Sequence, residues 1–181
     1  MSSRAEIDKR LAAVCEVARA AGALAMRHFN NLANLKVETK GPQNHVSIAD
    51  REVEELIVRD LSKAFPGDVF FGEEGGGESG KRIWIIDPID GTTNFLRGLP
   101  DWGVSIGFVQ DNKAEIGCIY LPTTDALYAA RRGGGATCNQ RPIHVSRTKK
   151  INHGMMSLGF SYRRGVPAFA AMTKRLLSAH C

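Results

Sequence analysis

The chain has 181 residues, with 24 Lys and Arg against 19 Asp and Glu, giving a formal net charge of +5 at pH 7. Its apolar stretches are far shorter than the roughly 20 residues that span a bilayer, which argues against a membrane protein. The four cysteines have no metal-ligand spacing, and no secretory signal pattern precedes them. We therefore expect reduced thiols in a cytoplasmic protein of one domain, or of one domain and part of another.

The N-terminal third predicts two amphipathic helices with a hairpin between them. Apolar residues recur at steps of three and four from Ile7 to Phe29, which is typical of one helix face. Residues 35–38 and 45–47 flank a Gly-Pro tip and predict a hairpin. A second apolar helical face follows and ends at the stop signal Phe65-Pro66-Gly67.

The middle of the chain predicts a sheet. Strands are expected at residues 69–72, 82–86, 102–109, 114–121 and 126–131. Short turns join several of these strands, so neighbouring strands should pair antiparallel. With the two helices, they predict an α+β fold, a layered α/β sandwich in which an antiparallel sheet is flanked by the two helices.

The segment Trp84–Phe95 contains the strongest chemical signal in the chain. The apolar, β-branched run before Asp87 predicts a buried strand that ends at Asp87, and Pro88 then favours a turn. Asp90 lies three residues beyond Asp87, so a tight turn can aim both carboxylates and the Ile89 carbonyl at one point. Such a cluster of oxygen ligands suits a hard cation such as Mg²⁺.

A phosphate cradle is predicted directly after these carboxylates. The backbone N–H groups of Gly91–Thr93 fall at a helix start, which is favourable for an anion. Asp-Pro and Asp-Gly are also common turn dipeptides, so a simple capped turn is the alternative. A second strand ending in Gly72-Glu73-Glu74 favours the functional interpretation, because it would bring Glu73 to the same sheet edge as Asp87 and Asp90.

The segment Asp87–Phe95, with Gly72-Glu73-Glu74 before it, resembles the inositol monophosphatase family of Mg²⁺-dependent, lithium-sensitive phosphatases. The resemblance runs from the first helix to about Ser157. It includes Ser47-Ile48-Ala49-Asp50 at the start of the second helix and a Gly133-Gly134-Gly135-Ala136 turn.

The resemblance implies a ligand set for two metal ions. Glu73, Asp87 and the Ile89 carbonyl would bind one Mg²⁺, for which Mn²⁺ is a plausible substitute, and Asp90 would bridge to a second Mg²⁺. Thr92 and Asp50 would orient the attacking water.

The resemblance also assigns residues beyond the metal ligands. Glu74 is counted with Thr92 and Asp50 as catalytic, and the substrate-binding residues would be Glu73, Asp90, Gly91, Thr92 and Thr93. For Asp50 a second interpretation stays open, because Ser47-x-x-Asp50 is also the pattern of a helix capping box.

The resemblance implies hydrolysis of a small phosphate monoester. Thr92-Thr93-Asn94-Phe95 is similar to the branch that acts on inositol 1-phosphate, while histidinol phosphate or a nucleotide bisphosphate are alternative substrates. Some bacterial members of the family are partners of the transcription machinery, which is a second functional hypothesis. A homodimer and no membrane partner are expected.

One family element has no match in the chain. The family completes its second metal site with an Asp in a Trp-Asp-x-Ala-Ala-Gly string, which this sequence lacks. Residues 141–181 carry eight basic residues and no acidic one, which would suit nucleic acid or a membrane surface but also a half-built domain. We expect a metal-binding phosphatase domain over residues 1–146, an incomplete C-terminal domain over 147–181, and weak or no activity.

Two secondary-structure elements are predicted in residues 147–181. Residues 155–160 are an apolar run that predicts a strand, and residues 169–177 predict an amphipathic helix.

Overall fold

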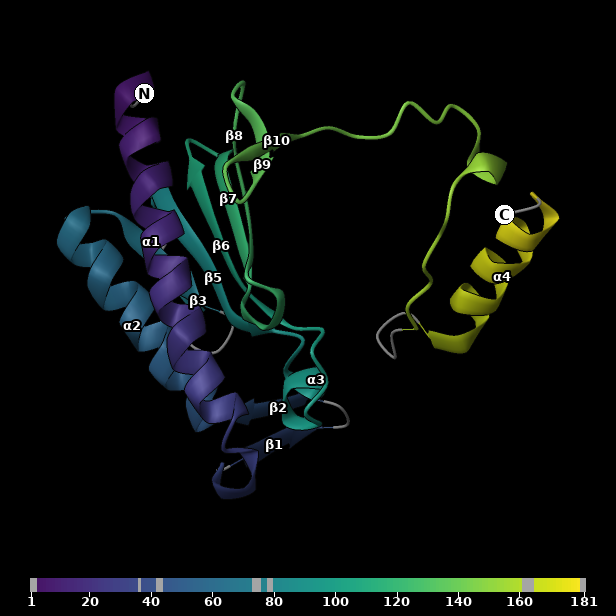
Figure 1. Ribbon diagram of the computed structural model, residues 1–181, viewed down its shortest axis with the longest axis horizontal. Helices are drawn as coiled ribbons and strands as arrows, with labels where there is room; N and C mark the ends of the chain where they lie inside the picture. The colour runs from purple at the N-terminus through teal and green to yellow at the C-terminus, as the bar shows by residue number, and fades with distance from the viewer. Residues whose placement is uncertain are drawn as a thin grey trace. The chain divides into compact units, whose positions relative to one another are not determined.

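The computed structural model describes residues 3–35, 37–41, 44–72, 76–77, 80–160 and 165–179. The chain divides into two compact units, Met1–Ile143 and His144–Cys181. The first unit is a helix layer packed on a sheet, and the second contains helix α4 (Gly165–Ser178) (Figure 1). Within the described part of the chain, no helix is both long enough and apolar enough to cross a bilayer.

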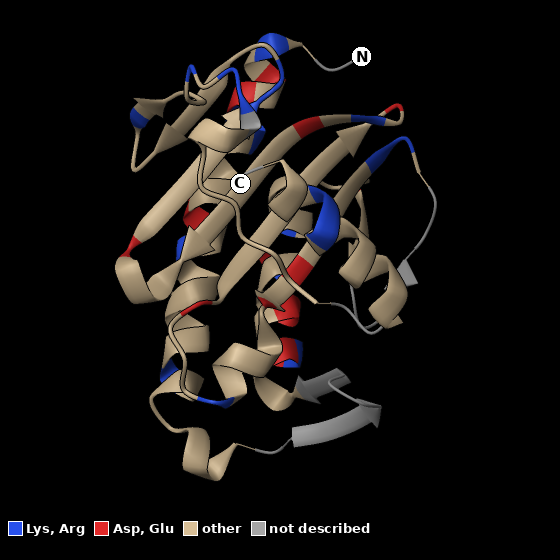
Figure 2. Ribbon diagram, turned by 90° about the vertical axis from the view of Figure 1, so that its right-hand side faces the viewer, with Lys and Arg blue, Asp and Glu red and all other residues tan. Residues whose placement is uncertain are grey.

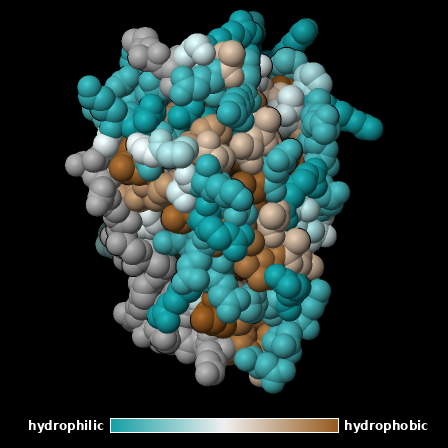
Figure 3. Space-filling view, turned by 90° about the vertical axis from the view of Figure 1, so that its left-hand side faces the viewer, coloured by the Kyte–Doolittle hydropathy of each residue, from teal (hydrophilic) through white to brown (hydrophobic). Residues whose placement is uncertain are grey.

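Two long helices form the helix layer. Helix α1 (Arg4–Phe29) begins at Ser3, whose side chain accepts a hydrogen bond from the Glu6 backbone N–H at 3.2 Å. Helix α2 (Ile48–Ala64) begins at a capping box and ends at Phe65. Both helices cover the same face of the sheet, because α1 contacts β6, β7 and β8 while α2 contacts β5. Their outer surface is mostly hydrophilic, as the amphipathic pattern predicts (Figure 3).

The main sheet has eight strands in the order β10-β9-β8-β7-β6-β5-β3-β4. They are β3 (Val69–Gly72), β4 (Gly76–Gly77), β5 (Arg82–Asp90), β6 (Gly103–Gln110), β7 (Lys113–Leu121), β8 (Ala126–Arg131), β9 (Gly135–Cys138) and β10 (Arg141–Ile143). A separate hairpin pairs β1 (Val37–Gly41) with β2 (Asn44–Ser47). Figure 2 looks onto the face of the sheet that α1 and α2 do not cover.

Short helical segments connect the strands. They are the 3₁₀ turns η1 (Leu32–Asn34), η2 (Pro122–Thr124) and η3 (Ile151–His153), together with the single-turn helix α3 (Thr92–Leu96).

The predicted α+β architecture is confirmed, but the sheet is not purely antiparallel. All described strand pairs are antiparallel except β3 and β5, which are parallel. The chain turns back through β4 before β5 begins, so β5 runs in the same direction as β3. Strand β5 is also longer than predicted, since it continues through Pro88 to Asp90, and β4, β9 and β10 were not predicted.

The strand predicted over residues 155–160 is wrong. These residues have no regular secondary structure. Their apolar composition suits a strand, but the described residues of the second unit contain no strand with which they could pair. The predicted helix over residues 169–177 is confirmed within α4, where Phe169 stacks edge-on against Phe160 at a centroid distance of 5.4 Å.

A buried ion network centred on Asp68 joins the helix layer to the sheet. The Asp68 side chain is fully buried and accepts hydrogen bonds from the Arg10 guanidinium at 3.2 Å and from the Trp84 indole N–H at 3.1 Å. Arg82 also contacts it, with its Nε 2.7 Å from Asp68 Oδ1. The Arg10 guanidinium lies 4.5 Å from the ring centroid of Phe65. A single carboxylate therefore connects α1, the segment after α2, and β5.

The irregular segment at the start of the second unit is expected to be a site of proteolysis. Residues 144–149 have no regular secondary structure and contain Arg147 and Lys149, and irregular backbone is the preferred substrate of proteases. We expect limited trypsin digestion of dilute protein to cut at Arg147–Lys150 before it cuts the sheet. Gel electrophoresis and mass spectrometry of the fragments check this. Earlier cleavage at the Arg131–Arg132 turn would contradict the prediction.

Candidate functional site

A β-bulge at the end of β5 determines which way its two carboxylates point. Asp87 pairs with Ser105 of β6 and Asp90 pairs with Gly103, so three steps on β5 match two steps on β6. In a regular strand, residues three apart point to opposite faces. The extra residue of the bulge restores the alternation, so Asp87 and Asp90 return to the same face of the sheet. Pro88 lies inside this bulge, where a missing N–H is tolerated.

The two carboxylates differ in exposure, and only Asp87 lines a hollow on the open face of the sheet. Asp87 is half-buried and Asp90 is exposed. A hollow of about 460 Å³ is lined by Asp87 and Ser105 at one end and by apolar residues such as Phe71 and Ile85 along its length. Ser105 was not predicted as a site residue. The signal for it is the strand register, because Ser105 is the cross-strand partner of Asp87.

Gly91 makes the turn from β5 into α3. Its φ is 95°, a left-handed conformation that favours glycine. Its carbonyl accepts hydrogen bonds from the N–H groups of Asn94 at 2.8 Å and Phe95 at 3.0 Å. The Phe95 ring is buried and packs edge-on against Trp102 at 4.9 Å, which anchors this short helix to the core.

Replacing Gly91 by alanine should strain this turn. A Cβ at position 91 would lie 2.9 Å from the Asp101 carbonyl oxygen and 3.3 Å from the Trp102 Cα. We expect a loss of about 1–3 kcal/mol in the free energy of unfolding, measured by urea denaturation. Gly133→Ala is the matched control, because Gly133 has a φ of 67° but open space around it. An equal loss in both variants would contradict the steric explanation.

The Thr92 hydroxyl donates a hydrogen bond to the Ile89 carbonyl oxygen at 3.0 Å. Ile89 was predicted to offer this same carbonyl to a metal ion. A carbonyl oxygen has two lone pairs, so the bond from Thr92 leaves capacity for a second partner. Thr93 follows Thr92 in the first turn of α3 and is half-buried.

Asp50 closes the capping box that was the alternative interpretation of its sequence pattern. Its Oδ2 accepts hydrogen bonds from the Ser47 N–H at 2.8 Å and the Ser47 hydroxyl at 2.7 Å. The side chain is buried. Strand β2, which leads into α2, contacts α3. Helix capping thus places Asp50 at the end of α2 that adjoins the Thr92 segment, and a catalytic role for it stays a prediction.

Two predicted site residues, Glu73 and Glu74, lie outside the described residues. Among the residues that the structure does describe, no group of three or more His, Cys, Asp or Glu side chains is close enough to hold a metal ion. The described part of the predicted ligand set is therefore Asp87, Asp90 and the Ile89 carbonyl, all on β5.

A sequence model of the inositol monophosphatase family matches residues 6–181. The chain belongs to this family. Among its curated relatives, the Nus factor SuhB of Xylella fastidiosa is 40% identical over 158 residues, which cover 87% of this chain and 58% of the relative. The inositol-1-monophosphatase of Mesorhizobium japonicum is 41% identical over 179 residues, which cover 91% of this chain and 67% of the relative.

Solved structures of inositol monophosphatase family proteins have the same fold. The extragenic suppressor protein suhB of Bartonella henselae superposes with a TM-score of 0.74 at 40% identity, covering 77% of this chain and 55% of that one. The Thermotoga maritima IMPase gives a TM-score of 0.73 at 35% identity, covering 78% and 55%. The chain thus spans a little over half the length of these structures.

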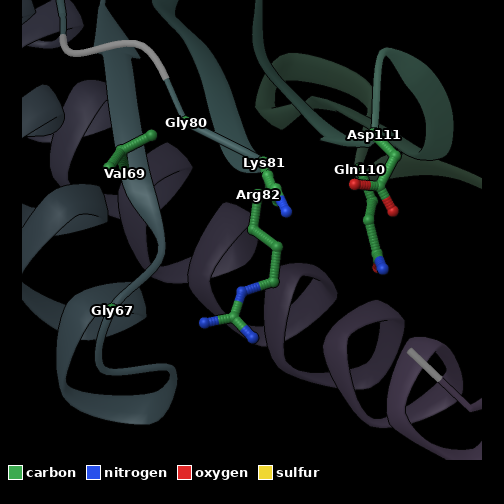
Figure 4. A pocket seen from close by; sticks show the side chains of 7 residues that line it. All are labelled: Gly67, Val69, Gly80, Lys81, Arg82, Gln110 and Asp111. Carbon is green, nitrogen blue, oxygen red and sulfur yellow. The ribbon is translucent and has the colours of Figure 1, made fainter. Parts of the chain in front are cut away.

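A second hollow in this family member lies at the opposite end of β5 from the candidate site. It has a volume of about 420 Å³ and is lined by residues at the starts of β3 and β5 and the end of β6 (Figure 4). Arg82 lines it, but its guanidinium is already paired with Asp68. Lys81 and Asp111 add opposite charges to its rim. This hollow contains no predicted site residue.

Proposed function

We propose that the protein of which these residues are a part hydrolyses a small phosphate monoester with the aid of Mg²⁺, and that inositol 1-phosphate is the substrate. The observation that supports this most directly is the β5 bulge, which turns Asp87 and Asp90 to one face immediately before the backbone amides of Gly91–Thr93. Membership of the inositol monophosphatase family supports the same activity.

The donor atoms at the end of β5 fit Mg²⁺ in their chemistry. Asp87, Asp90 and the Ile89 carbonyl offer only oxygen, and hard cations prefer oxygen ligands. These residues would hold the ion together with Glu73. When bound, Mg²⁺ would stabilise charge on the phosphate and lower the pKa of a coordinated water.

The remaining residues would bind and orient the reactants. The N–H groups of Gly91–Thr93 would donate hydrogen bonds to phosphate oxygens, as backbone amides at such a turn do for anions. Thr92 would turn its hydroxyl from the Ile89 carbonyl toward a water, and Asp50 would polarise that hydroxyl. Glu74 would assist as a further carboxylate. Catalysis of phosphoryl transfer depends chiefly on such positioning and electrostatic stabilisation.

Metal binding by the 181-residue chain tests this proposal. We expect Mn²⁺, titrated by calorimetry as a substitute for Mg²⁺, to bind and release heat, because the predicted ligands of the first site all lie within residues 73–90. Competition by Mg²⁺ and reversal by EDTA are the controls. An intact fold by circular dichroism without binding heat would contradict the proposal.

Phosphate release separates the candidate substrates. Inositol 1-phosphate, histidinol phosphate and a nucleotide bisphosphate are each incubated with the chain and Mg²⁺. We expect weak but preferential hydrolysis of inositol 1-phosphate, since the carboxylate that completes the second metal site in the family has no match in this sequence. Preference for another ester would reassign the substrate.

A second candidate function is binding to the transcription machinery. Relatives named Nus factor SuhB from three bacteria support it, at 35–40% identity. Glu73→Gln discriminates between the two functions, because it removes one predicted metal ligand while preserving side-chain size. A variant that loses phosphatase activity but keeps association with transcription complexes would favour the binding function.

A further inference from the structure

Two cysteines meet where α1 packs on the sheet. Cys118 of β7 is 1% exposed, and its Sγ lies 4.0 Å from the backbone carbonyl oxygen of Val14 in α1. Cys15 is the next residue of α1, is half-buried, and packs against the same core. Cys118 therefore packs against the turn of α1 that carries Cys15. The pair is far in sequence from the β5 carboxylates and takes no part in the proposed hydrolysis.

The environment makes the two thiols unequal. Contact with the Cys118 thiol and the positive charge of Arg19, one turn further along α1, lower the pKa of the Cys15 thiol more than its partial burial and the charge of Glu16 raise it. Contact with Cys15 and burial raise the pKa of the Cys118 thiol. Because the thiolate is the nucleophile in cysteine chemistry, Cys15 is the more reactive partner.

Arg19 is held in position by the neighbouring turn. Its guanidinium pairs with the Asp125 carboxylate at 2.5 Å and lies 5.0 Å from the ring centroid of Tyr120. Asp125 and Glu16 are negative charges on this side of α1, and Glu16 opposes the effect of Arg19 on Cys15. On balance the pKa of Cys15 is lowered, and contact with Cys118 is the largest cause.

We propose that Cys15 and Cys118 form an oxidation site that takes a hydroperoxide as its co-substrate. The Cys15 thiolate attacks the peroxide, the O–O bond breaks, and Cys15 becomes a sulfenic acid while the peroxide is reduced to water or an alcohol. The Cys118 sulfur then attacks the Cys15 sulfur, the S–O bond breaks, and water leaves as the disulfide forms. Two thiols are oxidised for each peroxide reduced.

A disulfide at this position would link the first helix to the centre of the sheet. It would join residues about a hundred positions apart in sequence, and cross-links that close long loops restrict the unfolded chain most. Oxidation should therefore raise the urea midpoint of unfolding, and a reductant should reverse the change.

The test uses the whole chain. Reduced protein is freed of reductant, treated with about one equivalent of hydrogen peroxide, blocked with N-ethylmaleimide and digested with trypsin. Each of the four cysteines lies in a different tryptic peptide, so mass spectrometry identifies any linked pair. We expect the peptides of Cys15 and Cys118 to be joined in monomeric protein, with the loss of two hydrogen atoms, and Cys138 to remain blocked by the maleimide.

Variants assign the two roles. Cys138→Ser should leave the linkage unchanged, whereas Cys15→Ser should abolish it and leave Cys118 reduced. Cys118→Ala should let a trapping reagent for sulfenic acids label Cys15. Arg19→Gln should slow alkylation of Cys15 several-fold, and Arg19→Lys, which keeps the charge, should not. If folded wild-type protein links Cys15 to Cys138 or Cys181, or accumulates no linked pair, the proposal is overturned.

Discussion

Replacement of Asp68 by alanine is expected to lower the free energy of unfolding by about 3–5 kcal/mol, which is the usual cost of breaking a buried ion pair. The Asp68 side chain has no solvent exposure, pairs with Arg10 and Arg82, and accepts a hydrogen bond from the Trp84 indole N–H. Without it, the Arg10 guanidinium stays buried and, of its described ion pairs, keeps only the one with Glu6 at 2.8 Å. Urea denaturation followed by circular dichroism measures the loss.

A surface pair of the same composition provides the control for Asp68. Asp60 pairs with Arg59 at 2.8 Å on the outer side of α2, where the Arg59 side chain is 69% exposed. Exposed ion pairs contribute little to stability. Asp60→Ala should therefore leave the urea midpoint nearly unchanged. A similar loss in both variants would show that burial of the Asp68 network is not the cause.

Asp87→Asn is expected to weaken Mn²⁺ binding by at least about a hundredfold. Loss of an outer-shell partner of a metal site already costs about 10–100-fold, and Asp87 is proposed to contact the ion itself. The amide keeps the size of the side chain but removes its negative charge. Calorimetry measures the affinity, and circular dichroism verifies the fold.

Asp111→Asn is the matched control for Asp87. Asp111 lies in the turn between β6 and β7 with a φ of 50°, a conformation that asparagine also tolerates. The turn lies at the opposite end of the sheet from Asp87, so metal binding should be unaffected. If Asp87→Asn binds Mn²⁺ as well as Asp111→Asn does, then Asp87 is not a ligand and the proposed site must be placed elsewhere.

The local structure around Asp87 and Gly91 could be predicted from the sequence, but the geometry that brings Asp87 and Asp90 to one face could not. Strand propensity before Asp87, and Gly91 followed by two threonines, are local patterns that survive in the fold. The bulge that turns Asp87 and Asp90 to one face depends on the register with β6. Strand register depends on tertiary packing, so no local sequence pattern predicts it.

The ion network of Asp68 was missed for a related reason. Asp68 follows a Pro-Gly turn, where aspartate is common and usually exposed. Its burial depends on Arg10, which is 58 residues earlier in the chain, and on Arg82 and Trp84 of β5. At residues 155–160 the apolar composition led to a wrong prediction of a strand, because the described residues of the second unit contain no strand with which it could pair.

The order of the strands also bears on how copies of the chain can associate. The described sheet ends in its two shortest strands, β4 with two residues and β10 with three, and Pro142 removes one N–H donor from β10. Short edges and proline are devices that prevent one sheet from templating another. A homodimer, which the family resemblance implies, would therefore form through side chains on the faces of the molecule, and a continuous intermolecular sheet is not expected.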